Sequence, residues 1–278
     1  MILLSRILCS LPVSLCDYIG KLLGEFMWLI VPGKRKKMAV ENIVCSLQIV
    51  ETQALSIAKQ STTRFGAMLV EVLRYPLLNK TSIKQHVIIK GQENLIEALA
   101  CGKGALLVSS HSGNWELIGT ALVLNGFSGA GVVQKQTNNG IDRFINEYRT
   151  KCGMDIRYKS SVREMMRLLG EGKVIGLLMD QHAGKAGVEV DFFGRPASTP
   201  TGAAALGRVM DAPVVPAFIT KNASGVHQLV IHKPLWVEKT ANRDKDVFML
   251  TEKITQIIEE HVRQFPQEWF WLHDRWKH

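Results

Sequence analysis

A histidine and a glutamate follow an apolar run in the stretch LLVSSHSGNWELIG, residues 106–119. His111 comes directly after the run, and Glu116 stands five residues later, just inside a segment with helical periodicity. A histidine with a carboxylate partner can take a proton from a substrate hydroxyl, because the carboxylate stabilises the imidazolium form. The chain contains no HExxH, GxSxG or GxxxxGK[ST] motif. The pair therefore indicates general-base chemistry, although its spacing alone is unspecific.

The elements around this pair alternate between short β-branched runs and helical segments from Val87 onward. Strands are predicted in VIIKG, ALLVSS, AGVVQK, VIGLLMD and APVVPAFIT, and helices near 92–101, 114–125, 140–152 and 243–264. The pattern predicts an α/β fold with a mostly parallel central sheet flanked by helices. HQLVIHK is predicted to be an edge strand. In such sheets ligands bind beyond the carboxyl ends of the strands, which is where His111 stands.

The N-terminal region is predicted to hold one long helix over residues 12–31. At about 1.5 Å per residue, a helix of this length reaches about 30 Å, the thickness of a bilayer's hydrocarbon core. Its charges, Asp17, Lys21 and Glu25, form one stripe, and four basic residues follow at 34–37. We expect a membrane-associated helix over residues 1–33 and an α/β domain over 34–278; a buried helix followed by a solvated charge run is the alternative.

Composition limits the classes of partner. The 278 residues carry a formal charge of +9, which favours an acidic partner such as an anionic membrane surface, a nucleic acid or an acidic protein. Basic residues are not interleaved with aromatic ones in any recognisable nucleic-acid module, so no nucleic-acid partner is predicted. The five cysteines have no CxxC spacing and indicate neither a disulfide framework nor a zinc site.

Several segments together resemble the bacterial lipid A biosynthesis acyltransferases, the lauroyl and myristoyl transferase family. They are LPVSLCDYIGKLLG, KKMAVENIVCSL, SSHSGNWELIG, IDRFINEYRTKCGMDIRY, the segment from Leu177 to Phe218, and PQEWFWLHDRWK. The resemblance implies a glycerolipid-acyltransferase-like fold and an enzyme on the cytoplasmic face of the cell inner membrane. It also implies acyl carrier protein as the acyl donor and partner, a lipid acceptor, and no metal or other cofactor.

The resemblance also assigns roles to residues. His111 becomes the base, and Glu116 orients it and raises its basicity. Arg149, which follows Arg143 in the matching motif, is assigned with Arg143 to substrate phosphate, because guanidinium groups suit phosphate oxygens. Asp180 and Gln181 match an Asp-Gln pair at a strand end. Asp180 positions either Arg149 or His111, or simply begins a turn.

Two aromatic groups have two interpretations each. The segment FFGRPASTPTGAAALG either places Phe192 and Phe193 in the wall of an acyl-chain pocket or packs closely against the sheet through its alanines and glycines. Trp269, Trp271 and Trp276 stand among basic residues, which suits a membrane interface as well as a packed C-terminal clasp.

The sequence thus predicts an acyltransferase that moves a fatty acyl chain from acyl carrier protein to a hydroxyl of a lipid A precursor. No activated serine or cysteine accompanies His111, so direct transfer without an acyl-enzyme is expected. Another membrane lipid, such as a lysophospholipid, glycolipid or ornithine lipid, is the alternative acceptor. An inactive membrane-bound scaffold is the alternative outside enzymes.

Overall fold

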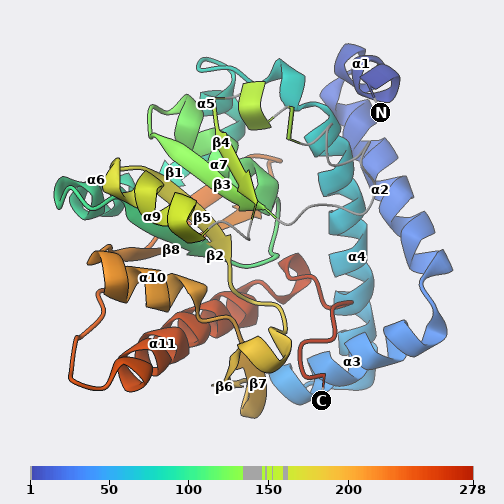
Figure 1. Cartoon of the computed structure of the whole chain (residues 1–278). Helices are drawn as coiled ribbons and strands as arrows, with labels where there is room; N and C mark the ends of the chain where they lie inside the picture. Colours follow the sequence, from blue (N-terminus) through green and yellow to red (C-terminus); the bar gives the residue numbers. More distant parts are fainter. Residues whose placement is uncertain (1, 134–145, 148, 152, 159–161, 278) are drawn as a thin grey trace.

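A seven-stranded sheet forms the centre of the computed structural model, which describes residues 2–133, 146–147, 149–151, 153–158 and 162–277 (Figure 1). Its strand order is β1-β9-β8-β2-β5-β3-β4. The strands span Val87–Lys90 (β1), Ala105–Ser109 (β2), Gly129–Val133 (β3), Asp155–Tyr158 (β4), Val174–Leu178 (β5), Val214–Lys221 (β8) and His227–Ile231 (β9). The five strands from β8 to β4 run parallel, whereas β9 is antiparallel to β8 and parallel to β1. The predicted α/β fold with a mostly parallel sheet is confirmed.

Helices cover both faces of the sheet. The helices after β1 include α6 (Gln92–Ala100), α7 (Trp115–Leu124), α9 (Val162–Gly170), α10 (Gly202–Met210) and α11 (Arg243–Gln264). Leu106 and Val108 of β2 pack in one core with α9, α10 and α11, while Ala105 and Leu107 pack in a second core with α6 and α7. This alternation follows from the two-residue side-chain period of a strand. β2 is therefore buried on both faces, as its uninterrupted apolar run indicates.

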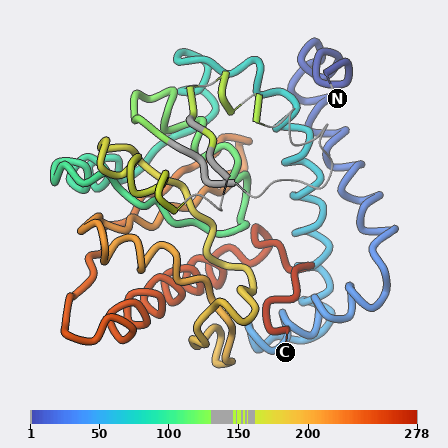
Figure 2. The backbone as a smooth tube through the Cα atoms, viewed as in Figure 1, coloured from blue at the N-terminus to red at the C-terminus, as the bar shows by residue number. Residues whose placement is uncertain are grey.

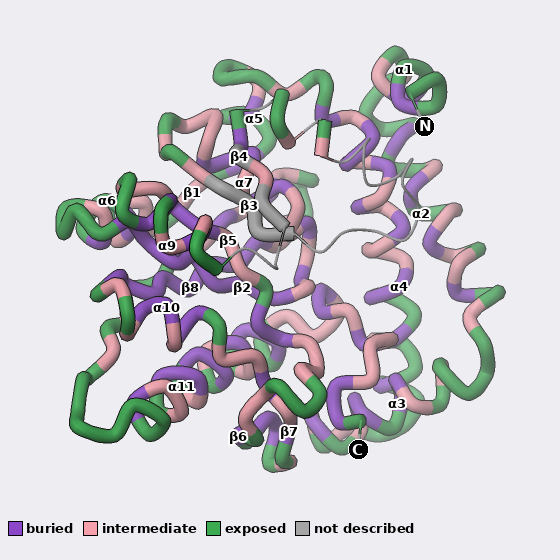
Figure 3. Tube along the Cα trace, in the orientation of Figure 1, coloured by how far each residue is buried: buried purple, intermediate pink, exposed green. Residues whose placement is uncertain are grey.

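The N-terminal helices stand beside the sheet domain. They are α1 (Ile2–Ser10), α2 (Val13–Ile30), α3 (Gly33–Leu47) and α4 (Glu51–Leu73), with the short α5 (Ile83–His86) leading into β1. α2 runs along α4, and its outer side is exposed (Figures 1 and 3). A Cβ atom added to Gly24 would lie 2.4 Å from Thr63 Cα, and one on Gly66 would lie 2.4 Å from Gly24 Cα. Only glycine permits this close approach of the two helix backbones.

The predicted helix over residues 12–31 is confirmed as α2, and Pro12 precedes its first turn. Three of its small residues and a tryptophan form the buried side, Cys16, Gly20, Gly24 and Trp28. None of the helices in the described part of the chain has both the length and the hydropathy that a membrane crossing demands.

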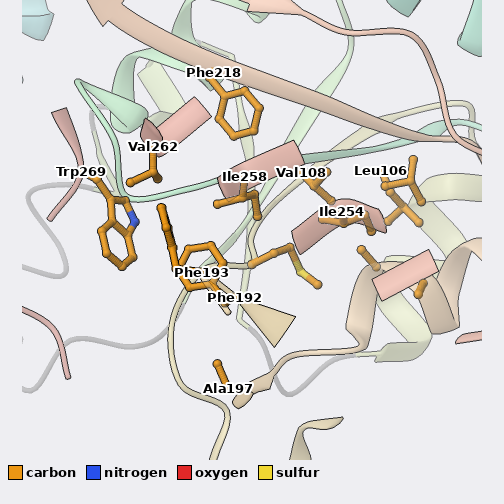
Figure 4. Packing of buried hydrophobic residues seen from close by; sticks show 14 of the residues in the cluster. Leu106, Val108, Phe192, Phe193, Ala197, Phe218, Ile254, Ile258, Val262 and Trp269 are labelled. Atoms are coloured by element: carbon orange, nitrogen blue, oxygen red, sulfur yellow. The ribbon is translucent and has the colours of Figure 1, made fainter. Parts of the chain in front are cut away.

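The three tryptophans of the C-terminal segment are buried and belong to the same core as Leu106 and Val108 of β2. Figure 4 shows Trp269 in this core. Trp269 and Trp271 are each 1% exposed, and Phe192 is 1% exposed. The segment passes beside α4 and α3 (Figure 2). It pins the hairpin of β6 (Val188–Phe192) and β7 (Arg195–Thr199), because the Trp276 ring stacks on Phe192 and its indole N–H donates to the Phe192 carbonyl. The packed-clasp interpretation holds for the tryptophans, and the packing interpretation holds for Phe192 and Phe193.

One sequence prediction about the sheet is wrong, and one of its strands was not predicted. HQLVIHK was expected at an edge, but β9 lies between β8 and β1, so β1 and β4 are the edge strands. β4 was not predicted, because DIRY alternates charged and apolar residues over only four positions and resembles the end of the preceding helix. The helix near 140–152 is described at residues 146, 147 and 149–151 only, where it is helical.

Candidate active site

The register of two neighbouring strands brings His111 and Asp180 together. Ser109, the last residue of β2, pairs with Leu178, the last residue of the parallel strand β5. His111 and Asp180 each stand two residues beyond these partners, at the carboxyl edge of the sheet. The Asp180 carboxylate accepts from the His111 backbone N–H at 2.8 Å, and its second oxygen lies 2.8 Å from His111 Nδ1. Of the interpretations left open for Asp180, the structure supports the positioning of His111.

Asp180 is ionised and buried, and three donors surround it. Besides the two groups of His111, the indole N–H of Trp269 donates to its Oδ2 at 2.7 Å. Burial alone would raise the pKa of Asp180, but the charge of His111 and these hydrogen bonds lower it to about 2. A carboxylate only accepts hydrogen bonds, so the proton of the neutral ring sits on Nδ1 and the Nε2 lone pair remains for a substrate.

The electrostatic surroundings make His111 a stronger base. Burial lowers the pKa of His111, but the Asp180 carboxylate, its hydrogen bond and the Glu116 charge together raise it above its ordinary value of 6.5. The His111 side chain is 20% exposed, so the protein holds the ring in place while part of the ring remains accessible to solvent. Its edge packs on Trp115, with ring centroids 5.0 Å apart. A partly exposed imidazole with a buried carboxylate partner suits general-base catalysis.

Glu116 does not orient the histidine ring as the sequence suggested. It lies in the first turn of α7 and forms a two-pronged ion pair with Arg149, whose Nε and Nη2 donate to the carboxylate at 3.0 and 2.6 Å. Arg149 also donates to Asn146 Oδ1 at 2.9 Å. The planar guanidinium fork matches a carboxylate, and this pairing turns Glu116 toward Arg149. Glu116 contributes to the basicity of His111 through its charge, while Asp180 is the hydrogen-bond partner.

A largely apolar cavity with about 720 Å³ of empty space, open mouth included, begins at this ion pair. It runs along α7 and the strands β2, β5 and β3, and its apolar lining includes Leu107, Ile118, Leu122, Met154, Val174 and Leu177. Trp115, Glu116 and Arg149 lie at its polar end. The cavity suits an extended apolar chain whose polar end lies at Glu116 and Arg149. His111 does not line this cavity, but its ring contacts Trp115, which does.

Two residues assigned to substrate from the sequence remain apart from this arrangement. Arg143 lies outside the described residues. Gln181 is half-buried in the loop after β5, and within the described part of the chain it is not hydrogen-bonded to His111 or Arg149. Phe192 and Phe193 do not line the cavity at the ion pair; they pack with Trp276 in the opposite core.

Sequence reasoning missed the role of Trp269. Besides its bond to Asp180, its backbone forms an isolated bridge with Ser112, and the Phe270 N–H donates to the His111 carbonyl at 3.0 Å. The EWFW segment therefore holds the loop that carries the base. The sequence shows a cluster of aromatic residues near the C-terminus, which is typical of a buried segment. It does not show which loop this cluster contacts.

Comparison with known proteins fits this geometry. The family model described as bacterial lipid A biosynthesis acyltransferase matches residues 1–278. The chain belongs to this family. As a member of the lipid A biosynthesis acyltransferase family it is an acyltransferase, and the family resemblance seen in its motifs is confirmed.

Relatives of this acyltransferase differ in the lipids for which they are named. The phosphatidylinositol mannoside acyltransferase of Mycobacterium tuberculosis is 27% identical over 223 residues, 78% of this chain and 69% of that protein. A lipid A biosynthesis acyltransferase of Haemophilus influenzae is 20% identical over 271 residues, 96% of this chain and 83% of that protein. The crystal structure of the 1-acyl-sn-glycerophosphate acyltransferase PlsC from Thermotoga maritima aligns with a TM-score of 0.43 at 14% identity, covering 90% of this chain and 97% of that one.

Proposed function

We propose that this acyltransferase moves a fatty acyl group from a thioester donor to a hydroxyl of a membrane lipid, with His111 as the general base. The observation that carries the proposal is the His111–Asp180 pair, whose imidazole contacts Trp115 at the polar end of an apolar cavity. Asp180 fixes the ring and the tautomer, so that Nε2 receives the proton of the acceptor hydroxyl. This replaces the expected His-Glu pair with a His-Asp pair and keeps the same base.

The reaction follows from these positions. As His111 Nε2 takes the hydroxyl proton, the acceptor oxygen attacks the thioester carbon, and a tetrahedral intermediate with a negative oxygen forms. Backbone N–H groups at the start of α7 stabilise that oxygen, because preorganised donors stabilise charge that develops during the reaction. Collapse breaks the carbon–sulfur bond, and the departing thiolate takes the proton from the His111 imidazolium. No acyl-enzyme is formed.

We assign acyl carrier protein as donor and a lipid A precursor as acceptor, on the family membership. A mannosylated phosphoinositide-type glycolipid is the second candidate acceptor, because the Mycobacterium relatives are named for phosphatidylinositol mannoside. The Glu116 carboxylate already accepts from two nitrogens of Arg149. For these nitrogens to bind a phosphate of the acceptor or of the carrier, the phosphate would have to displace Glu116.

We also propose that α1 and α2 attach the enzyme to the membrane surface. Large apolar side chains are exposed along their outer side: Ile2, Leu3, Leu4, Ile7, Val13, Leu15, Tyr18, Leu22, Phe26, Leu29 and Ile30. Residues 34–37, all basic, begin the next helix at the end of this face. An apolar helix face beside clustered positive charge is typical of binding to an anionic lipid surface. This supports a place at the cytoplasmic face of the inner membrane.

A radiolabelled transfer assay tests the function. Purified enzyme is given acyl-acyl carrier protein or acyl-coenzyme A with a lipid A precursor, a phosphatidylinositol mannoside or a lysophospholipid, and products are identified by mass spectrometry. We expect transfer to a lipid hydroxyl, and His111→Ala should lower it about 100-fold or more, the usual contribution of a general base. His86→Ala, at an exposed histidine, is the matched control. Full activity of His111→Ala, or a covalent acyl-enzyme during turnover, would contradict the mechanism.

A further inference from the structure

A buried polar contact holds the base-bearing loop from the side opposite Asp180. Asn114 is 2% exposed and immediately precedes α7. Its Oδ1 accepts from the Tyr75 hydroxyl at 2.9 Å, and its Nδ2 donates to Glu71 Oε2 at 2.6 Å. Both partners come from the end of α4 and the turn after it. The loop from His111 to Asn114 is therefore tied to Asp180 at one end and to Glu71 at the other.

The direction of the Asn114 side chain is unusual for its position. Asparagine before a helix normally caps it, because the side-chain oxygen accepts from a backbone N–H of the first turn. Asn114 makes no such bond. Its oxygen is taken by Tyr75 and its amide by Glu71, so the polar end of α7, next to Glu116 and the cavity, is not covered by its own cap.

Glu71 is itself held by two further side chains, those of Lys221 and His227. Lys221 Nζ donates to its Oε1 at 2.8 Å, and His227 Nε2 lies 3.0 Å from Oε2. Burial would raise the pKa of Glu71, but its hydrogen bond with His227 and the charges of His227 and Lys221 lower it to about 2. Lys221 also reaches Asp17 of α2, but that carboxylate is 47% exposed and such a pair contributes little. Glu71 is thus a fixed negative acceptor, and the inner contacts decide its position.

We propose that Glu71 is a positioning residue for acyl transfer, which holds the Asn114 side chain away from the start of α7 and so fixes the loop between His111 and Glu116. The inference rests on the proposed function and adds to it a residue that touches neither substrate nor base. Because Glu71 acts through loop geometry, its loss lowers kcat more than it raises KM. A displacement of about 1 Å at a reacting group costs about 100-fold in rate.

The experiment is an exchange of donor and acceptor. Glu71→Gln removes the charged acceptor with little change of shape, and Asn114→Asp places a second carboxylate against Glu71, where like charges repel. In the double variant Glu71→Gln with Asn114→Asp, the glutamine amide donates to the aspartate, so the bond is restored with reversed polarity and equal charge. Kinetics in the transfer assay and thermal unfolding are measured for each form, with Glu97→Gln, at an exposed glutamate of α6, as the control.

We expect kcat of each single variant to fall by about 10- to 100-fold with KM little changed, and the double variant to recover about tenfold. Normal kcat in Glu71→Gln, or a double variant no better than the poorer single one, would overturn the inference. If Glu71→Gln does not fold, Tyr75→Phe removes the other tie, and a normal kcat there overturns it instead. A wild-type enzyme without transfer activity would overturn the proposed function, whereas an active wild type with a normal Glu71→Gln overturns only the role of Glu71.

Discussion

A single carboxylate does two jobs for His111, because Asp180 accepts from both its backbone N–H and its ring. The backbone bond fixes where the residue lies, and the ring bond fixes the tautomer. The usual third partner of such an arrangement is a serine or cysteine nucleophile, and among the described residues no serine or cysteine side chain is hydrogen-bonded to the His111 ring. In the proposed reaction, the hydroxyl that loses its proton to His111 therefore belongs to the acceptor lipid.

Replacement of Asp180 by asparagine is expected to shift the pH dependence of kcat/KM. The neutral imidazole is the active form, and Asp180 raises its pKa, so wild-type activity rises as pH passes a midpoint above 6.5. Without the carboxylate, burial lowers the pKa of His111, and this midpoint moves to lower pH. The tautomer is no longer fixed, so the maximal rate falls by about two orders of magnitude or more. An unshifted acid limb in the pH–rate profile would contradict the pairing.

Replacement of Trp269 by phenylalanine should weaken the same group from the other side. The ring still fills its place in the core, but Asp180 loses the indole N–H donor. A hydrogen bond to a buried charge contributes about 1.5 to 3 kcal/mol, and the free energy of unfolding in urea should fall by that amount, together with kcat. Trp236→Phe, at a tryptophan that is 46% exposed, should leave both unchanged.

The sequence singled out His111 as the candidate base, but the carboxylate beside its ring is that of Asp180 and not that of Glu116. Glu116 is near in sequence, and its helix turns its side chain to Arg149. Asp180 is 69 residues away, and only the β2–β5 register brings it to the ring. His111 and Asp180 both follow the carboxyl ends of apolar strands, and this much is visible in the sequence. The order and register of the strands depend on tertiary packing, which cannot be read from a single sequence.

At the scale of elements, α7 contributes both to the Glu116–Arg149 ion pair and to the wall of the apolar cavity. Its first turn carries Glu116 toward Arg149, and the side of the helix with Ile118, Gly119 and Leu122 forms a wall of the apolar cavity. A Cβ atom on Gly119 would come within 2.1 Å of Met154 Cε, so the methionine tip occupies the space that the glycine leaves. These two residues together set the room available inside the cavity.

Changes at Gly119 and Met154 are expected to alter acyl chain length in opposite directions. Gly119→Val fills the cavity and should favour shorter acyl donors, whereas Met154→Ala enlarges it and should favour longer ones. Met154 is buried, so its truncation should also cost about 2 to 5 kcal/mol of stability. Mass spectrometry of products from a mixed series of donors gives the readout. Val209→Ala, on an exposed position of α10, is the control, and an unchanged product distribution in both variants would exclude this cavity as the acyl site.

Element prediction succeeded where periodicity was strong and failed where tertiary context decides. The helix predicted over about 243–264 matches α11, and the one over 12–31 matches α2 to within a residue at each end. β9 has the alternating burial of a half-covered strand, which is equally compatible with an edge and an inner position. Its neighbour β1 precedes it by more than a hundred residues, so the sequence offers no local sign of that pairing.

At the scale of the whole molecule, charge and exposed apolar surface meet at one end. Tyr18, Leu22 and Phe26 follow one another at four-residue steps on the outer side of α2, and each is exposed. The opposite side of the helix is locked against α4 through Gly24 and Gly66. The apolar face is therefore presented outward by a rigid support rather than by a loose tail.

Charged residues on that face should release the enzyme from lipid. Burial of a leucine or phenylalanine side chain contributes about 1.5 to 3 kcal/mol, so Leu22→Glu with Phe26→Glu should weaken binding to anionic phospholipid vesicles by about 100-fold or more. Vesicle sedimentation measures the effect, and neutral vesicles should bind less than anionic ones because of residues 34–37. Glu93→Gln with Glu97→Gln, on exposed positions of α6, is the control. Unchanged sedimentation of the charged variant would refute attachment through α2.

The bond from Trp269 to Asp180 spans 89 residues of sequence. During synthesis on the ribosome, the histidine and its aspartate emerge long before the tryptophan that secures them. The hydrogen-bonded group around His111 is thus complete only when this late segment has been translated and has packed against α4.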